Sequence, residues 1–364
     1  MATIALDATY SVDPEPTGIA VYSKRLVETL LELDSPHRFL LCYRLSRWRR
    51  RREFLRPAPG RRFGVRLFQE PITFWLPWQA QLFHSLAQRP PAFHFRKEVV
   101  TVFDIFPITG RDYSTRGFQQ KFGRLLRDAV GRAARVITAS RYTAEQLRKH
   151  CGIEDAKICV VPVGVDPPES IATAGARRKE RERWVGGGNE LVLVVGAIQN
   201  RKNTLGAVRA ARLLPAQYRF VLAGGNGYGS ETVHDFIRRE GLSDRVLTLG
   251  YVSPAQLESL YCAASVLLFP SFEEGFGIPL LEAMARGVPV VAAGTSSLPE
   301  VGGEAARYVN PDSVEAIATE VQRVVEDEAL RARSVRLGIE RAAQFTWLQT
   351  ATETLRVYEE VLQK

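Results

Sequence analysis

The feature that most constrains the fold is an alternation of short apolar runs with stretches of helical periodicity, repeated along the chain of 364 residues. Such runs are typical of strands buried in a parallel sheet. In the first half the expected strands are Thr3–Asp7, Arg38–Tyr43, Val99–Val102, Arg135–Thr138 and Ile158–Val161. In the second half they are Leu191–Val195, Arg219–Leu222, Val246–Leu249, Val266–Phe269 and Val288–Val291. The pattern predicts two doubly wound α/β domains.

The boundary between the two series lies in residues 167–188. This segment contains Pro167, Pro168, the charged run RRKERER and Gly186–Gly188, without an apolar stripe. Such a composition is typical of a connection, so we expect domains at 1–166 and 189–345 joined by a linker that includes a short solvated helix. Ligands of these sheets bind outside the carboxyl ends of the strands, which places the expected site in the cleft between the domains.

Positive charge is concentrated in the first domain. Residues 1–166 hold 27 Lys and Arg against 16 Asp and Glu, a net charge of +11, whereas the remainder carries −2. This asymmetry fits an anionic substrate, an anionic membrane surface or nucleic acid. We do not expect nucleic acid, because no recognised binding module accompanies the charge. Arg47–Arg56 mixes arginines with Trp48, as at a membrane interface, or is a plain solvated charge run.

Several other classes of protein are not expected, because the sequence motifs typical of them are absent. No apolar run approaches the roughly 18 residues of a membrane span, and the start of the sequence lacks the features of a secretory signal. The four cysteines form no C-x-x-C pair and the five histidines lack metal-ligand spacing, so no disulfide framework or metal site is expected. G-x-S-x-G is absent, which argues against hydrolase chemistry through that turn.

The segment SFEEGFGIPLLEA at Ser271–Ala283 carries the strongest functional signal. Glu274 and Glu282 bracket a Gly-Phe-Gly turn at Gly275–Gly277, and the turn lets the backbone approach a ligand closely. Glu282, about one turn into a helix that begins near Pro279, can accept hydrogen bonds from a ribose diol. The alternative for such a pair is one carboxylate that offsets a helix dipole and another on a solvated face.

Amide and cationic groups of the second half are expected to bind phosphate. A helix N-terminus suits an anion, and because Pro279 has no N–H, Ile278 and Leu280 are the expected donors. Arg201 and Lys202, which follow a predicted strand, are placed to neutralise a diphosphate, or are solvated surface cations. A weaker signal comes from Gly18, which opens the first helix without a G-x-G-x-x-G fingerprint. Gly224–Gly227, another strand end, is either a turn or part of the site.

Together these segments resemble glycosyltransferase family 4, the retaining sugar-nucleotide transferases of the GT-B fold. The segments in family order are TGIAVYSKRLVETL, VVTVFDIFPI, RVITASRYTAEQL, ICVVPVGVD, VVGAIQNRKN and SFEEGFGIPLLEAMARGVPVVAAGTSSLPEVGGEAARYVNPD. The resemblance implies two Rossmann-like domains, of which the first binds the acceptor and the second binds the nucleotide sugar. It also implies that residues 346–364 form a helix that crosses back to the first domain.

The resemblance also implies roles for individual residues. Glu282 is expected to bind the ribose, and Glu274 and the amides of Gly275–Gly277 to face the donor sugar. Arg201 and Lys202 are expected to hold the diphosphate and stabilise the leaving charge, an electrostatic contribution to catalysis. The other residues implied for the catalytic group (Asp104) or for donor binding are Gly18, Phe103, Gly196, Phe276, Ile278 and Leu280.

The implied reaction moves a hexose, mannose-like by weak preference, from a GDP- or UDP-sugar to a glycan or lipid-linked glycan in polysaccharide biosynthesis. The departing phosphate oxygen takes the acceptor proton on the same face, so no enzyme nucleophile is expected. The resemblance also implies that no metal is needed, because Arg, Lys and a helix N-terminus do its work, and no further cofactor is expected. The expected location is the cytoplasm or the inner face of the membrane. The alternatives are a sugar-nucleotide epimerase of the same fold and a catalytically silent sugar-nucleotide binder.

Two positions depart from the family pattern. Phe103 stands before Asp104 where the family has a His that contacts the donor sugar, which suggests packing against a deoxy or less polar sugar. Gly196 is followed by Ala197 instead of the usual Arg, and Arg201 is expected to serve in its place.

Overall fold

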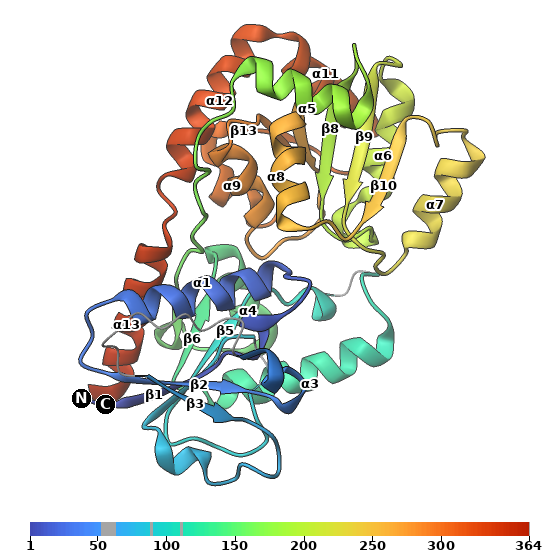
Figure 1. The fold of residues 1–364 in the computed structure, drawn as a ribbon. Coiled ribbons are helices and arrows are strands. Elements are labelled where there is room, and N and C mark those ends of the chain that lie inside the picture. The colour runs from blue at the N-terminus through green and yellow to red at the C-terminus, as the bar shows by residue number, and fades with distance from the viewer. Residues whose placement is uncertain (52–62, 88–89, 110–111, 364) are drawn as a thin grey trace. The chain divides into compact units, whose positions relative to one another are not determined.

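The computed structural model describes residues 1–51, 63–87, 90–109 and 112–363 and divides into two compact units. Unit 1 comprises residues 1–109, 116–164 and 345–364, and unit 2 comprises 165–344 with Gly110–Thr115, of which residues 112–115 are described. Each unit has a parallel sheet with helices packed on it (Figure 1). The α/β class predicted from the alternating pattern is therefore confirmed.

Unit 1 is built on a sheet of seven strands in the order β3-β2-β1-β4-β5-β6-β7, with all pairs parallel. The strands are β1 (Thr3–Asp7), β2 (Arg38–Tyr43), β3 (Phe63–Leu67), β4 (Leu82–Ser85), β5 (Glu98–Val102), β6 (Arg135–Thr138) and β7 (Ile158–Val160). The α-helices are α1 (Gly18–Glu32), α3 (Arg116–Arg132), α4 (Arg141–Cys151) and α13 (Trp347–Gln363). The strand order reverses between β1 and β4.

Unit 2 has a six-stranded sheet in the order β10-β9-β8-β11-β12-β13, again with all pairs parallel. The strands are β8 (Glu190–Val195), β9 (Tyr218–Ala223), β10 (Val246–Gly250), β11 (Val266–Phe269), β12 (Val290–Ala293) and β13 (Ala306–Val309). The α-helices are α5 (Ala174–Val185), α6 (Thr204–Leu213), α7 (Ser230–Arg239), α8 (Pro254–Ala263), α9 (Ile278–Ala285), α10 (Leu298–Gly302), α11 (Val314–Glu326) and α12 (Glu328–Ala342). The strand order reverses between β8 and β11.

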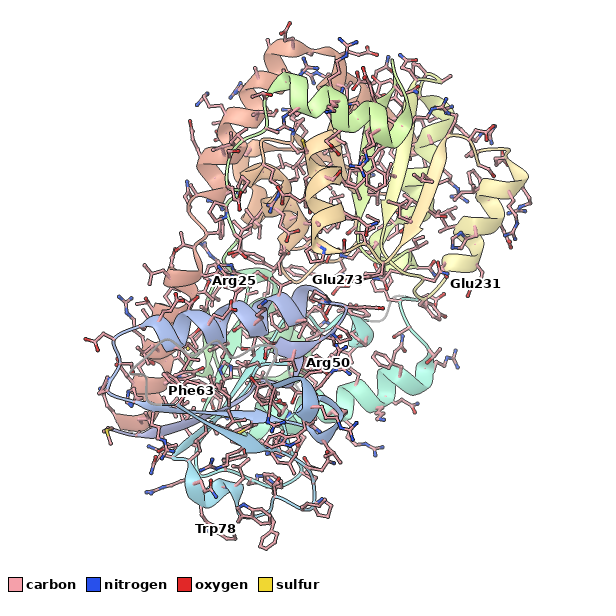
Figure 2. All side chains as sticks on the ribbon, in the orientation of Figure 1. Arg25, Arg50, Phe63, Trp78, Glu231 and Glu273 are labelled. Atoms are coloured by element: carbon pink, nitrogen blue, oxygen red, sulfur yellow. The ribbon has the colours of Figure 1, made fainter. Side chains whose placement is uncertain are left out.

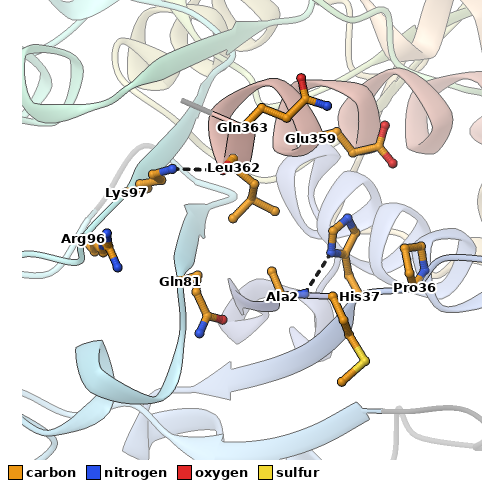
Figure 3. Close-up of a pocket in the computed structure, with 10 residues that line it drawn as sticks. Ala2, Pro36, His37, Gln81, Arg96, Lys97, Glu359, Leu362 and Gln363 are labelled. Atoms are coloured by element: carbon orange, nitrogen blue, oxygen red, sulfur yellow. Dashed lines mark hydrogen bonds between the residues drawn. The ribbon is translucent and has the colours of Figure 1, made fainter.

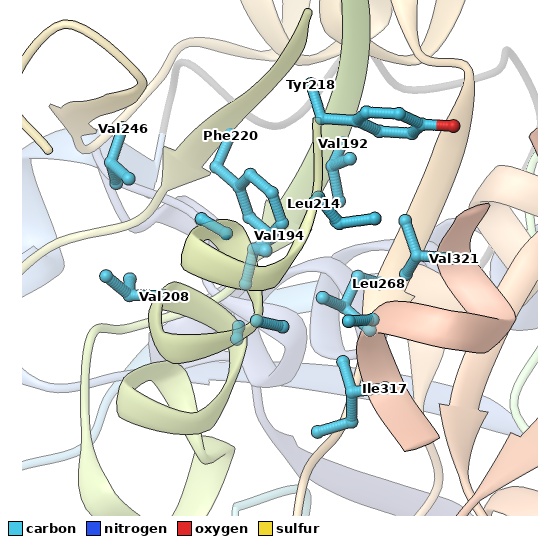
Figure 4. Close-up of a cluster of buried hydrophobic side chains, with 14 of the residues drawn as sticks. Val192, Val194, Val208, Leu214, Tyr218, Phe220, Val246, Leu268, Ile317 and Val321 are labelled. Atoms are coloured by element: carbon cyan, nitrogen blue, oxygen red, sulfur yellow. The ribbon is translucent and has the colours of Figure 1, made fainter. Parts of the chain in front are cut away.

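The core of unit 2 explains why its strands are apolar along their length. Helices cover both faces of the sheet, so successive residues of β8 are buried although they point to opposite sides. Figure 4 shows Val192, Phe220 and Leu268 of the sheet packed with Ile317 of α11. The start of α8 follows from its sequence, because Ser253 and Gln256 form the reciprocal capping box that the spacing predicts.

The segment 167–188, whose composition predicts a linker, lies within unit 2. Its helix α5 packs against α8, and Arg181 donates to the Ala263 carbonyl and pairs with Glu190 at 2.9 Å. The charged run that gives α5 no apolar stripe thus supplies polar contacts on the surface of unit 2. Among the described residues, no helix combines the length and the apolar character needed to cross a membrane.

Helix α13 belongs to unit 1, although unit 2 separates it in sequence from the rest of that unit. It packs against α1, and the Trp347 ring lies 6.4 Å from the Tyr22 ring. The backbone of Trp347 passes so close to Gly164 that a Cβ there would lie 2.4 Å from the Trp347 amide nitrogen. A glycine is therefore required where the chain leaves unit 1.

Candidate functional site

The candidate site of unit 2 lies at the carboxyl ends of β8 and β11, the neighbouring strands between which the strand order reverses. Ligands of open α/β sheets bind at such a switch point, because the connections from the two strands run in opposite directions and leave a crevice. Gly196 and the 3₁₀ turn Asn200–Lys202 follow β8, and Ser271–Gly277 follows β11. The sheet topology therefore brings together two motifs that lie about 70 residues apart in the sequence.

The centre of this site is a buried cluster of three charges. The Glu274 carboxylate accepts a hydrogen bond from Arg201 Nη1 at 3.0 Å and lies 2.6 Å from Lys202 Nζ. Arg201 also donates to the Glu273 carbonyl, and its own carbonyl accepts from the Phe272 amide. Burial opposes ionisation of Glu274, but the two cations outweigh it and lower the pKa of that carboxyl to about 2. Glu274 is thus a fixed negative charge that aligns both cations.

Glycines set the position of Lys202. The backbone of Gly196 has φ of +127° and lies under the lysine stem, since a Cβ there would be 3.2 Å from Lys202 Cε. The Lys202 ammonium also lies 4.8 Å from the centre of the Phe269 ring, a cation–π contact. Gly224 approaches Gly196 even more closely, because a Cβ on Gly224 would lie 2.1 Å from the Gly196 carbonyl oxygen. The predicted glycine-rich strand end at Gly224–Gly227 therefore packs against the loop after β8.

Three hydroxyl side chains after β12 hold the loop of Glu274, and the sequence analysis missed this role. Thr295 Oγ1 donates to the Phe272 carbonyl, and Ser296 Oγ accepts from the Glu274 amide at 3.1 Å. Ser297 Oγ donates to the carbonyls of Glu274 at 2.9 Å and of Phe276 at 3.1 Å. Because C=O and N–H point in opposite directions across a trans peptide, these bonds turn the amides of Gly275 and Gly277 away from Ser297. The available signal was a run of three hydroxyl residues at a strand end.

The start of α9 differs from the expectation in one respect. Gly277 has φ of +104°, and a Cβ there would lie 2.8 Å from Leu298 Cδ2, so the turn needs glycine. Ile278 is the first helical residue, with Pro279 next. The expected donation by Leu280 to a phosphate is not supported, because the Leu280 amide donates to the Gly277 carbonyl at 3.0 Å and its side chain is buried.

Glu282 lies one turn into α9 and is oriented by a tyrosine. Tyr261 of α8 donates its hydroxyl to Glu282 Oε2 at 2.9 Å. Burial raises the pKa of the Glu282 carboxyl, although this bond and Arg286 act in the opposite direction. A carboxylate has about four acceptor positions, so the bond to Tyr261 leaves acceptor capacity for a diol. Sequence reasoning did not identify Tyr261, which has no motif of its own.

The remaining candidates lie in unit 1. Gly18 is the first residue of α1 and is exposed. Phe103 and Asp104 follow β5 and are half-buried. The Phe103 ring packs edge-on against Tyr22 with ring centres 4.8 Å apart, and the Phe103 carbonyl accepts a hydrogen bond from Thr143 at 3.0 Å. An aromatic ring at this position is therefore held by packing.

A buried chain of hydrogen bonds supports Tyr22, another feature that sequence reasoning missed. The Tyr22 hydroxyl lies 3.2 Å from Thr101 Oγ1, which lies 2.8 Å from His84 Nε2. His84 Nδ1 lies 2.6 Å from the Tyr358 hydroxyl of α13. Burial lowers the pKa of His84 to about 3, so the ring is neutral at ordinary pH. The network joins α1, β4, β5 and α13 beneath Phe103.

Two other features of unit 1 lie apart from this strand edge. The pocket in Figure 3 is lined by Ala2, His37, Gln81 and Lys97, which lie at the amino-terminal ends of strands, the opposite edge of the sheet from Phe103.

In Arg47–Arg56, residues 52–56 lie outside the described residues, and Arg51 stacks over the Trp48 ring at 3.9 Å. Within the described ranges, no three His, Cys, Asp or Glu side chains gather closely enough to hold a metal ion.

Two protein-family models match this chain, one over each of two consecutive segments. The family described as "Glycosyltransferase Family 4" matches residues 13–169, and "Glycosyl transferases group 1" matches residues 176–341. O-antigen chain mannosyltransferase B of Escherichia coli is 28% identical over 72% of this chain and 70% of its own length. D-inositol 3-phosphate glycosyltransferase of Nocardiopsis dassonvillei is 33% identical over 63% of this chain, but the match spans only 56% of that relative.

A solved structure shares the fold over the whole chain. Anabaena HepE in complex with UDP-glucose superposes with a TM-score of 0.79 at 18% identity, covering 99% of this chain and 100% of that one. The two family matches follow one another and together cover most of the sequence, from the loop after β1 to the end of α12. The chain belongs to glycosyltransferase family 4, with the GT-B fold.

Proposed function

We propose that this protein is a retaining glycosyltransferase that moves a hexose from a nucleoside diphosphate sugar to a glycan or glycolipid acceptor in polysaccharide biosynthesis. The observation that carries the proposal is the buried cluster in which Glu274 aligns Arg201 and Lys202 at the switch point of unit 2. A guanidinium has five N–H donors and an ammonium has three. Both cations can therefore bind phosphate oxygens while they remain paired with Glu274.

The proposed chemistry is a displacement on one face of the sugar. The bond from the anomeric carbon to the diphosphate oxygen breaks, and the bond to the acceptor oxygen forms on the same side. The acceptor proton passes to the departing phosphate oxygen, and the nucleoside diphosphate leaves. Arg201 and Lys202 stabilise the charge that grows on the diphosphate, and the amides of Gly275 and Gly277 face the donor. No metal is part of this proposal.

Residue roles outside the cluster are also proposals. Glu282, oriented by Tyr261, accepts hydrogen bonds from the ribose hydroxyls. Phe103 presents an apolar ring to the sugar, Asp104 acts beside it, and Gly18 leaves room for phosphate or acceptor. Mannose is favoured because the E. coli relative is named a mannosyltransferase, and that relative also motivates the polysaccharide setting. The D-inositol 3-phosphate relative supports a different acceptor class, so a donor panel is needed.

The test begins with nucleotide binding. UDP, GDP, ADP and dTDP are titrated into wild type, Glu282→Ala and the control Glu340→Ala, whose carboxylate is exposed and pairs with Arg336 at 3.1 Å. A nucleotide at about 100 times its dissociation constant adds about 2.7 kcal/mol of stability, seen as a higher melting temperature. We expect one base to be selected, with its shift lost in Glu282→Ala and kept in Glu340→Ala. No shift with any nucleotide would contradict the proposal.

Turnover then separates the alternatives. With the selected donor and a panel of sugars, release of nucleoside diphosphate that depends on acceptor indicates transfer, and NMR of the product tests whether the anomeric configuration is retained. Donor conversion without acceptor would indicate an epimerase, and binding without turnover a silent binder. Phe103→His in the same panel tests the role of Phe103, and an unchanged sugar preference would contradict it.

A further inference from the structure

Unit 1 exposes a cluster of aromatic side chains between β3 and β4. Ile72, Phe74, Trp75 and Trp78, here called the aromatic segment, are 56, 62, 43 and 78% exposed. Figure 2 shows Trp78 at the margin of unit 1, directed away from the sheet. Four large apolar residues exposed within seven positions form a patch of the kind that marks an interaction surface.

The exposure is built into the local structure. Thr73 and Leu76, which alternate with the exposed residues, are 2 and 1% exposed and face the core. Thr73 Oγ1 accepts from the Gln69 amide and donates to the Gln69 carbonyl, and Leu76 belongs to the cluster that includes Phe68 and Phe83. With its inward side chains anchored, the segment holds the four outward ones at the surface.

The chemistry of the segment favours lipid over sugar. The Phe74 ring packs against the Trp75 and Trp78 rings at interplanar angles of 78° and 88°, so the three rings do not form the flat face on which a sugar ring stacks. No charged residue lies between residues 71 and 81, and the Gln79 amide oxygen already accepts from Arg66. Tryptophan beside apolar side chains is typical of the interface of a bilayer.

We propose that the aromatic segment inserts into the interface of an anionic membrane and holds unit 1 there. The net charge of +11 on residues 1–166 supplies the attraction to anionic lipid. Within the described part of the basic segment, residues 47–51, the Arg51 guanidinium covers the Trp48 ring at 3.9 Å, whereas Trp75 and Trp78 are 43 and 78% exposed.

The test measures binding of the purified protein to phosphatidylcholine vesicles with and without phosphatidylglycerol. We expect binding that requires the anionic lipid, weakens with added salt, and falls at least about tenfold in Phe74→Ser/Trp75→Ser/Trp78→Ser. The matched control is Phe118→Ser/Leu125→Ser on α3, whose side chains are 44 and 46% exposed, and it should bind like wild type. Equal loss in the two variants, or no loss in the first, would overturn the proposal.

A second measurement does not depend on disruptive substitutions. Vesicles should shift the tryptophan emission of wild type to shorter wavelength, and Trp75→Phe/Trp78→Phe should bind with this shift largely removed. A shift that persists in that variant would place other tryptophans in the membrane and overturn the proposal. So would a dimer in solution that the serine variant dissociates, because the segment would then bind a second copy of the chain. Since no measurement uses sugar transfer, failure here leaves the proposed function untouched.

Discussion

The two sheets hold their functional edges by different physical means. In unit 2 the loop of Glu274 is fixed by a buried ion cluster and by the hydroxyls of Thr295, Ser296 and Ser297. In unit 1 the end of β5 rests on aromatic packing against Tyr22 and on a neutral chain of hydrogen bonds through His84. Buried charges organise the edge of unit 2, whereas aromatic packing and uncharged hydrogen bonds organise the edge of unit 1.

The difference shows that net charge does not indicate where buried cations gather in this molecule. Residues 167–364 carry a net charge of −2, yet they contain the paired cations proposed to bind the diphosphate. The positive excess lies in the other half of the chain. What matters at a phosphate site is local alignment of cations in a buried setting, where their interaction with an anion is less screened than in water.

The largest expected effect comes from breaking the ion cluster. Arg201→Met leaves Glu274 buried with one cation, and losing a partner of a buried ion pair costs about 3–5 kcal/mol. We expect a loss of this size in the free energy of unfolding of unit 2, measured with urea. The control is Arg336→Met, which removes the exposed pair with Glu340 and should cost less than about 1 kcal/mol. Equal stability of the two variants would mean that charge does not organise this edge.

An intermediate effect is expected from the neutral network of unit 1. His84→Leu leaves the buried hydroxyls of Thr101 and Tyr358 without this partner, at a cost of about 2 kcal/mol. Tyr358→Phe removes one bond and should cost about 1 kcal/mol. Nucleotide affinity should stay unchanged in both, because the cations lie in unit 2. Calorimetric titration checks this, and a parallel loss of affinity would show that the two edges are coupled.

The smallest effect is a pH dependence that separates the two glutamates. Burial raises the pKa of Glu282, so acidification protonates it earlier than an ordinary glutamate and removes an acceptor for the ribose. Glu274, with a pKa of about 2, stays ionised. We expect nucleotide affinity to fall more steeply with decreasing pH in wild type than in Glu282→Gln, because only the wild type loses an ionised acceptor at this position. The variant controls for protonation of the nucleotide, and identical slopes would contradict the role of Glu282.

The pKa shifts of Glu274 and Glu282 have opposite effects on how the stability of the fold depends on pH. Glu274 stabilises the fold above its unfolded pKa near 4.5, and this contribution is lost as the pH falls toward 2. The raised pKa of Glu282 means that its neutral form favours the folded state, so its contribution decreases as the pH rises through that pKa.

Sequence reasoning predicted the elements whose signal is local. Strands such as β8 are continuous apolar runs, and α8 begins at a complete capping box. It missed β3, β4 and β13, which are short and contain Arg66, His84 and Arg307 in place of an unbroken apolar run. His84 is buried in β4 only because Thr101 and Tyr358 satisfy its ring nitrogens, and neither partner is near it in sequence.

The residues of the candidate site also fall into those that a local sequence signal predicts and those that depend on contacts made by the fold. Arg201, Lys202 and Glu274 each follow a predicted strand, and parallel pairing of β8 and β11 brings them together. Ser297 and Tyr261 could not be predicted, because their roles depend on which carbonyl or carboxylate the fold places beside an ordinary hydroxyl. Leu280 is a residue for which a local signal gave a wrong prediction. Its place at a helix N-terminus predicts that its amide donates to a phosphate, but this amide donates to the Gly277 carbonyl within the first helical turn.

The place of α13 in unit 1 has a consequence for biosynthesis. A ribosome that has made residues 1–164 has made every strand of the first sheet, but not the helix whose Tyr358 and Trp347 pack against its buried side chains. At about 5–20 residues per second, synthesis of the intervening unit takes on the order of tens of seconds. During that interval the surface of α1 that α13 will cover stays open, and unit 1 is completed only after unit 2 has been made.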